Sequence, residues 1–198
     1  MDIPVKKRLA DAALNAATAK GATYADVRIG RYLNQYVMTR ENRVQNIINT
    51  ESFGVGVRVI ANGCWGFAAI GDTQSEEDVA RTAEKAVLFA KAHARLIKKP
   101  VQLAPQKGFG EVSWKTKVDK HSFEVPVKEK VDLLLTANGI ALQNGANFVN
   151  NTLFMINEQK YFASTDGSYI DQDVHRIWPS FTVTAVDKAS GLMATRDS

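Results

Sequence analysis

Cysteine is almost absent from this chain, which has a single one, Cys64, among its 198 residues. One cysteine cannot form an internal disulfide, so a disulfide-stapled scaffold is excluded and a reducing compartment is favoured. Long apolar runs are also missing, because no stretch approaches the roughly 20 apolar residues of a membrane span. The N-terminal segment MDIPVKKRLADAALNAATAK is polar and lacks the apolar core of a signal peptide. These features predict a soluble cytoplasmic protein with no membrane partner.

A strong charge of either sign is lacking as well, since the formal net charge is only +4 at pH 7. Nucleic-acid-binding domains usually carry a denser basic stripe. Some basic and aromatic residues could still contact nucleic acid by charge and stacking: Lys115, Lys117, Lys120, Arg176, Trp114 and Trp178. Alternating lysines are more typical of a soluble edge strand. We therefore predict no nucleic-acid partner.

Helical and strand periods alternate along the chain, which predicts an α+β fold with antiparallel sheets and helices packed on one face. We expect helices over residues 4–19, from Thr73 in a capping box with Glu76, and from Pro126. Strands are expected at residues 24–30, 35–40, 53–59, 64–70, 112–118, 148–156, 161–164, 168–175 and 181–187.

Two units are predicted from the distribution of breakers. Residues 1–100 form the first α+β unit, and residues 101–110 hold Pro105 and two glycines, which is typical of a linker. Residues 111–198 form a second, central unit. It stops at Ser198 without a closing element, so we expect it to be truncated at its C-terminal end.

The segment 41–72 carries the clearest strand pattern and predicts three consecutive antiparallel strands. In residues 53–59 every odd position is apolar, which is the period of a half-buried strand. Asn62-Gly63 then supplies the two-residue turn that twisted hairpins prefer. Trp65 and Phe67 follow on one face, and we expect both rings to pack against the second helix.

Three short motifs follow one another in this region: ADVR at residues 25–28, SFGVGVRV at residues 52–59 and GCWGFA at residues 63–68. Together with the long helix after them, they resemble the N-terminal domain of the TldD/PmbA metallopeptidase family, once labelled modulators of DNA gyrase. The likeness continues more loosely from FASTDGSYIDQD to Ser198, so it covers most of the chain.

The resemblance implies a zinc metallopeptidase that acts on peptides or unfolded segments, with an active site enclosed in a homodimer or in a heterodimer with a family paralogue. The family's zinc motif, H-E-x-x-x-H, is not found in residues 1–198. We therefore expect zinc in the full-length parent, with the catalytic motif downstream of this chain. Residues 1–198 would then hold no catalytic residue and no cofactor, and would be inactive alone. The alternative is a non-catalytic partner subunit or interaction module of the same family.

A zinc site within the chain would need three or four converging ligands. The histidines His93 and His121 have no set of partners at ligand spacing. Asp171, Asp173 and His175 alternate along an expected strand, so their side chains share one face and could hold a divalent cation. A solvated sheet face shows the same pattern, and we favour that interpretation.

Arg28 and Arg58 lie within expected strands, where Asp26 is available as a partner. They could form structural ion pairs, or they could meet a peptide carboxylate. Trp65, beside them in the hairpin, could instead anchor a partner or a substrate peptide, where aromatic residues dominate binding energy. These three residues are the candidate substrate or interface residues of the sequence.

Overall fold

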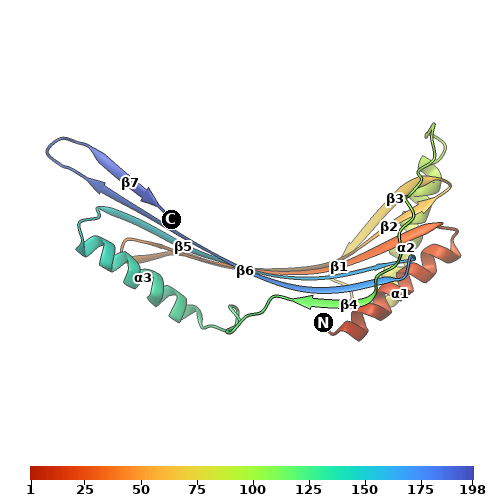
Figure 1. Cartoon of the computed structure of the whole chain (residues 1–198), viewed down its shortest axis with the longest axis horizontal. Helices are drawn as coiled ribbons and strands as arrows, with labels where there is room; N and C mark the ends of the chain where they lie inside the picture. The colour runs from red at the N-terminus through yellow and green to blue at the C-terminus, as the bar shows by residue number, and fades with distance from the viewer. The chain divides into compact units, whose positions relative to one another are not determined.

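The computed structural model describes residues 1–198 as three helices and one mixed sheet of seven strands (Figure 1). The helices are α1 (Ile3–Ala19), α2 (Glu76–His93) and α3 (Val127–Gln143). The strands are β1 (Tyr24–Arg40), β2 (Arg43–Ala61), β3 (Cys64–Gly71), β4 (Gly110–Lys115), β5 (Phe148–Ser164), β6 (Ser168–Val186) and β7 (Met193–Asp197). The predicted α+β class is confirmed, although β4 pairs with β6 in parallel. No helix is long and apolar enough to cross a membrane.

The strands follow the order β3-β2-β1-β5-β6-β4, with β7 paired to β6. Several are 17 to 19 residues long, well beyond the usual five or six. The expected splits of β1, β5 and β6 into two strands each are therefore wrong, and segment 41–72 holds two strands rather than three. Polar stretches such as residues 157–160 stay extended inside a strand, where the sequence pattern indicated a break. The Asn62-Gly63 turn is confirmed, with positive φ at both residues.

Close packing divides the chain into two compact units, each made of separate segments. Unit 1 comprises residues 1–32, 52–115 and 158–173. Unit 2 comprises residues 33–51, 116–157 and 174–198. Strands β1, β2, β5 and β6 each give residues to both units. The domain boundary that we expect at residues 101–110 is not tested by this division into units and stays a prediction.

Unit 1 buries an apolar core between one face of its sheet and the helices α1 and α2 (Figure 1). The core is rich in alanine and valine, which lets the helices approach the strands closely. Its largest fully buried side chains are Leu9, Val27, Val55, Val57, Val59, Val79 and Val87. Tyr161 and Ala163 of β5 complete this core from the far end of the sequence.

Gly66 sets the distance between α2 and β3. A Cβ atom placed there would lie 2.0 Å from the carbonyl oxygen of Ala86 and 2.8 Å from the Cβ of Ala90. The backbone of α2 therefore rests directly on the strand, which no larger residue permits. The neighbouring positions on this face are also small, with Cys64 buried and Ala68 packed against the core.

Trp65 and Phe67 lie on the opposite face of the sheet, so the expectation that they pack against the second helix is wrong. Across the hairpin Trp65 is paired with Ile60 and Phe67 with Arg58, and directly opposed residues share a face. Phe67 is 60% exposed. The physical reason is the close contact at Gly66, which leaves no room for aromatic rings beneath α2.

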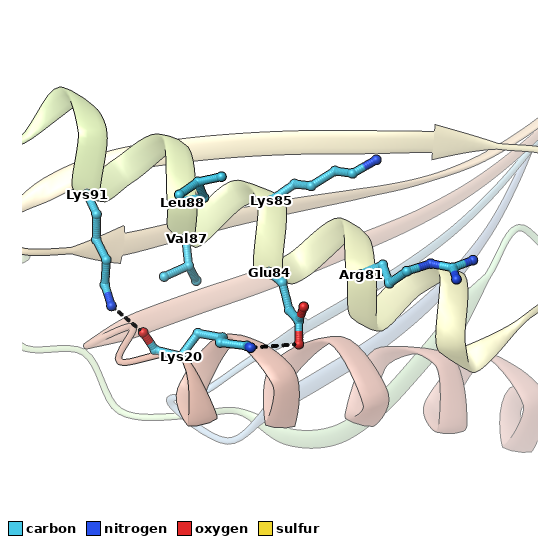
Figure 2. Close-up of a pocket in the computed structure, with 7 residues that line it drawn as sticks. All are labelled: Lys20, Arg81, Glu84, Lys85, Val87, Leu88 and Lys91. Atoms are coloured by element: carbon cyan, nitrogen blue, oxygen red, sulfur yellow. Dashed lines mark hydrogen bonds and ion pairs between the residues drawn. The ribbon is translucent and has the colours of Figure 1, made fainter.

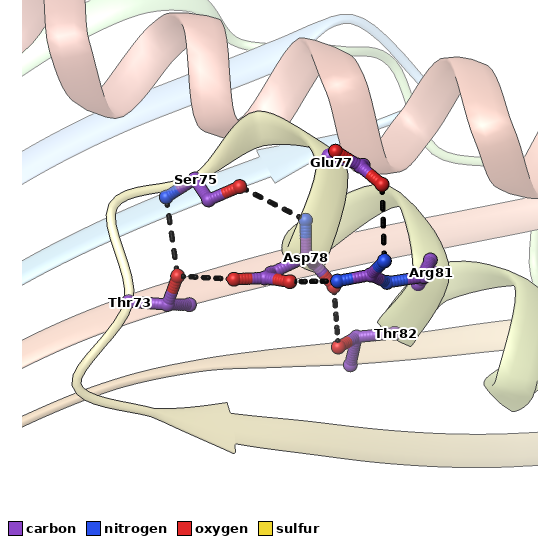
Figure 3. Close-up of polar contacts among 6 residues, drawn as sticks. All are labelled: Thr73, Ser75, Glu77, Asp78, Arg81 and Thr82. Atoms are coloured by element: carbon purple, nitrogen blue, oxygen red, sulfur yellow. Dashed lines mark hydrogen bonds and ion pairs between the residues drawn. The ribbon is translucent and has the colours of Figure 1, made fainter.

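The N-terminus of α2 is capped by Ser75, and not by Thr73 as predicted (Figure 3). The Asp78 amide donates to Ser75 Oγ at 3.3 Å, which satisfies one of the helix's free donors. Thr73 Oγ1 instead donates to the Asp78 carboxylate at 3.0 Å, and it accepts from the Ser75 amide. The hydrogen bond from Thr73 and the contact with Arg81 lower the pKa of Asp78. The helix start is thus fixed by a polar network, and its N-cap lies two residues later than the sequence indicated.

Unit 2 has a small apolar core and a large buried polar layer beneath α3. Its apolar cluster has three buried members, Val37, Leu134 and Met155, and partly buried hydrophobic residues pack against them. Lys130, only 4% exposed, donates to Gln35 Oε1, and Gln35 donates to Asn49 Oδ1 at 2.6 Å. About two turns further on, Asn138 is fully buried and donates to Thr39 Oγ1 and to the Glu41 carbonyl. Hydrogen bonds therefore specify much of this interior.

Candidate functional site

The helix-free face of unit 1, opposite α1 and α2, gathers the candidate residues Arg28, Arg58 and Trp65 around Asp26. Asp26 is 1% exposed, although it lies on this face. Arg58 donates from both Nε and Nη2 to Asp26 Oδ2, at 2.8 Å in each case. Its guanidinium also lies 4.6 Å from the ring centroid of Trp65, within the range of a cation–π contact. Arg58 is therefore a structural partner of a buried carboxylate.

Arg28 is held far less tightly. Its Nε lies 3.6 Å from Asp26 Oδ1, beyond hydrogen-bond distance, and its side chain is 60% exposed. The guanidinium lies 5.8 Å from the ring centroid of Phe162 on β5. Nearby, Tyr24 packs edge-on against Trp65. Burial, and then the negative charge of Asp26, raises the pKa of Tyr24 to about 12, so this hydroxyl stays neutral.

A pocket of about 430 Å³ opens on the same face beside Arg28. Its lining comes from β1, β5 and β6: Arg28, Ile29, Gly30, Tyr32, Lys160, Tyr161, Phe162, Ile170 and Gln172. Two of these residues are cationic and none is acidic. Of these residues only Arg28 was predicted as a site residue, because the order of β1, β5 and β6 in the sheet is not visible in the sequence. The alternation of side chains between the two faces of each strand was the one signal in the sequence for the other lining residues.

Asp171, Asp173 and His175 are not brought together as a metal-binding group. Asp171 Oδ1 accepts from Lys6 Nζ at 2.7 Å, which ties β6 to α1. His175 Nε2 lies 3.0 Å from Asn157 Nδ2, and its ring packs against that of His121. No three His, Cys, Asp or Glu side chains of residues 1–198 gather in a way that could hold a metal ion. The residues present therefore do not fit the zinc that the family resemblance implies.

A second hollow, of about 390 Å³, lies between the C-terminal end of α1 and the outer side of α2 (Figure 2). Its charges are largely used within the protein. Lys20 Nζ lies 3.3 Å from the Glu84 carboxylate, and Lys91 donates to the Lys20 carbonyl at 2.7 Å. Arg81 contacts Glu77 and Asp78. The contacts of Lys20 fasten the end of α1 to α2, whereas those of Arg81 lie within α2, so we interpret the hollow as structural.

Two family descriptions match the chain. One, PmbA/TldA metallopeptidase domain 1, covers residues 25–90. The other, the PmbA/TldA metallopeptidase central domain, covers residues 120–198. A metalloprotease of Methanothermobacter thermautotrophicus is 26% identical over 157 residues, which are 78% of this chain and 32% of that protein.

Solved structures share the fold at low identity. A candidate modulator of DNA gyrase from Thermotoga maritima superposes with a TM-score of 0.73 at 17% identity, over 98% of this chain and 41% of that one. TldE of Thermococcus kodakarensis gives a TM-score of 0.65 at 12% identity, over 93% of this chain and 41% of that one. At such identities the likeness concerns the fold alone.

The fold and the two matched regions define a chain that resembles the first and the central domain of one metallopeptidase family. Together the matched regions cover well over half of the sequence. The chain belongs to the PmbA/TldD metallopeptidase family, as its motifs predicted. It spans about a third of the length of the curated relative that it matches and about two fifths of the solved structures.

Proposed function

We propose that this chain forms the N-terminal and central part of a zinc metallopeptidase that cleaves peptides or unfolded segments. The observation that carries the proposal is the match of both family domains in order, at residues 25–90 and 120–198. The relative named as a metalloprotease, of which the chain spans 32%, supports it. In this proposal the zinc ligands and the catalytic residues are supplied by sequence outside residues 1–198, in a cytoplasmic homodimer or heterodimer.

Within such an enzyme, residues 1–198 would bind and orient substrate. The helix-free face of unit 1 suits this role, because it combines exposed aromatic rings with cationic side chains. The charged hydrogen bonds between Arg58 and Asp26 hold these two side chains in place on this face. Arg28, which is only loosely held, remains able to meet an anionic group.

A non-catalytic partner subunit of the same family is the second candidate. This candidate is favoured by the contacts that possible metal ligands on β6 already make. Asp171 forms an ion pair with Lys6, and His175 contacts Asn157. A partner subunit would use the same sheet face to hold a segment that another chain cleaves. Both candidates therefore predict binding by residues 1–198 and differ in the metal content of the parent.

The test compares residues 1–198 with the product of the complete coding sequence. We expect the full product to contain H-E-x-x-x-H, to bind zinc in a ratio of about one per chain, and to cleave an unfolded protein until a chelator is added. Residues 1–198 should not cleave the same substrate with added zinc. A full product without zinc would favour the partner subunit. Metal-dependent cleavage by residues 1–198 that is lost in Asp173→Ala or His175→Ala would contradict both.

A further inference from the structure

We propose that the pocket beside Arg28 binds the C-terminal residue of a peptide, holding its α-carboxylate and an apolar side chain. That the ligand is a peptide rests on the proposed function. It concerns only residues of unit 1, in strands β1, β5 and β6. Three features of the pocket match three parts of that ligand.

The charge of the pocket matches a carboxylate. Arg28 and Lys160 line it, and no acidic side chain does. Two carboxylates lie near these cations. Asp26 takes two hydrogen bonds from Arg58, and Glu158 forms an ion pair with Lys160 Nζ at 3.4 Å, so Arg28 is the cation that is not tightly paired. Counting Arg58 with these groups leaves an excess of one positive charge at the pocket.

Arg28 is the residue placed to supply this charge. Its guanidinium is mostly exposed and lies over the Phe162 ring, an arrangement that orients the planar group. A guanidinium can bind a carboxylate through two parallel hydrogen bonds, which a lysine cannot do. Lys160 adds a second donor from the neighbouring strand β5. The two cations therefore form one anion site with Arg28 as its principal member.

The rest of the lining is suited to the remainder of a C-terminal residue. Tyr32, Phe162 and Ile170 give apolar walls, and the amide of Gln172 can pair with a peptide group. The Tyr32 ring lies directly against Gly30, where an added Cβ would be only 3.0 Å from it. A volume of about 430 Å³ accommodates one large side chain with its carboxylate, and it lies within the usual range of ligand pockets.

The experiment titrates residues 1–198 with the peptide acetyl-Gly-Ser-Gly-Ala-Phe as the free acid and as the C-terminal amide, using calorimetry. We expect the free acid to bind and the amide to bind at least about tenfold more weakly. Arg28→Gln should weaken binding of the free acid by about tenfold, and Lys160→Gln by about threefold. Lys85→Gln, which removes an exposed charge of the other hollow, is the matched control and should change affinity less than about twofold.

Circular dichroism of each variant shows whether it is folded, and Lys160→Gln tests the site if Arg28→Gln does not fold. Equal affinity for acid and amide would overturn the proposal, as would no binding up to about 1 mM or an equal loss in Lys85→Gln. A free-acid peptide that binds residues 1–198, beside a full product without metal-dependent cleavage, would sink only the proposed function. Cleavage without carboxylate-dependent binding would sink only this inference.

Discussion

Units 1 and 2 of this chain bury their interiors by different means. Unit 1 packs alanine and valine between two helices and a sheet, so its stability rests on apolar burial and close fit. Unit 2 has three core residues in its apolar cluster and relies on buried amides, a hydroxyl and one lysine. Burial of polar groups contributes little net stability but penalises wrong arrangements. Unit 1 is therefore held by packing, whereas unit 2 is specified by hydrogen bonds.

The largest loss of stability is expected for Gly66→Ala in unit 1. The added Cβ would collide with backbone atoms of α2, which cannot move as a flexible side chain can. We expect unit 1 to lose about 4 kcal/mol, near the upper end for single substitutions. Urea unfolding monitored by amide hydrogen exchange measures the loss of stability in each unit separately. Gly139→Ala, on α3 with nothing within 4 Å of the new Cβ, should be neutral or stabilising. Equal losses in both variants would contradict the contact.

Core truncations compare the two interiors directly. Leu9→Ala removes one of the largest fully buried side chains of unit 1, and we expect a loss of about 4 kcal/mol. Leu134→Ala in the smaller cluster of unit 2 should cost about 2 kcal/mol, because fewer apolar neighbours lose contacts. Hydrogen exchange should show each loss mainly in its own unit. A larger loss for Leu134→Ala would mean that unit 2 also depends on apolar packing.

Lys130→Met tests the polar interior through its pH dependence. Burial lowers the pKa of Lys130, so the folded state disfavours the protonated amine. The unfolded state then binds more protons, and the stability of unit 2 should rise with pH between the lowered folded pKa and the unfolded value of about 10.4. This rise should be missing in the variant. At pH 7 the free energy of unfolding should change by no more than about 1 kcal/mol. Removal of a buried charge stabilises the variant, and loss of the donor to the Gln35 oxygen offsets this gain.

Urea midpoints of both proteins between about pH 7 and pH 9.5 provide the measurement, below the range in which tyrosines ionise. Parallel pH profiles for the two proteins would contradict the account of Lys130.

The smallest effects are expected on the helix-free face. Trp65→Ala should destabilise unit 1 by about 1 kcal/mol, since the ring contacts Tyr24 and Arg58 but lies outside the core. Phe67→Ala should cost about 0.5 kcal/mol, because most of that ring is already in water. A thermal melt of each variant is sufficient. Loss of fold in Trp65→Ala would restore the original assignment of this ring to the core.

The sequence was sufficient for the local features that depend on nearby residues. The helix starting at Ile3, the Asn62-Gly63 turn and the α+β class follow from period, turn chemistry and composition. The long strands could not be predicted, because their polar stretches stay extended only through neighbours in the sheet. The error at Trp65 has the same origin. The alternation of side chains along β3 was predicted correctly. Which of its two faces is covered is decided by the contact of Gly66 with α2, which the sequence does not show.

The candidate site shows the same limit. Asp26, Arg28 and Arg58 were recognisable as possible partners, because all three lie within expected strands, in the ADVR and SFGVGVRV motifs. Lys160 and Phe162 were not, since they reach the pocket from a strand more than 120 residues away that pairs with β1. Charge alone did not reveal the site either, because its two cations lie far apart in the sequence.

The segmented composition of unit 1 has a consequence for synthesis on the ribosome. Its core includes Tyr161 and Ala163, which are translated long after α1 and α2 have left the exit tunnel. Until then β1 lacks β5 as its neighbour, and one of its edges is exposed to other chains. Closing such distant contacts is slow, because loop entropy must be overcome first. The nascent chain therefore passes through an interval in which a chaperone would have an unprotected strand to bind.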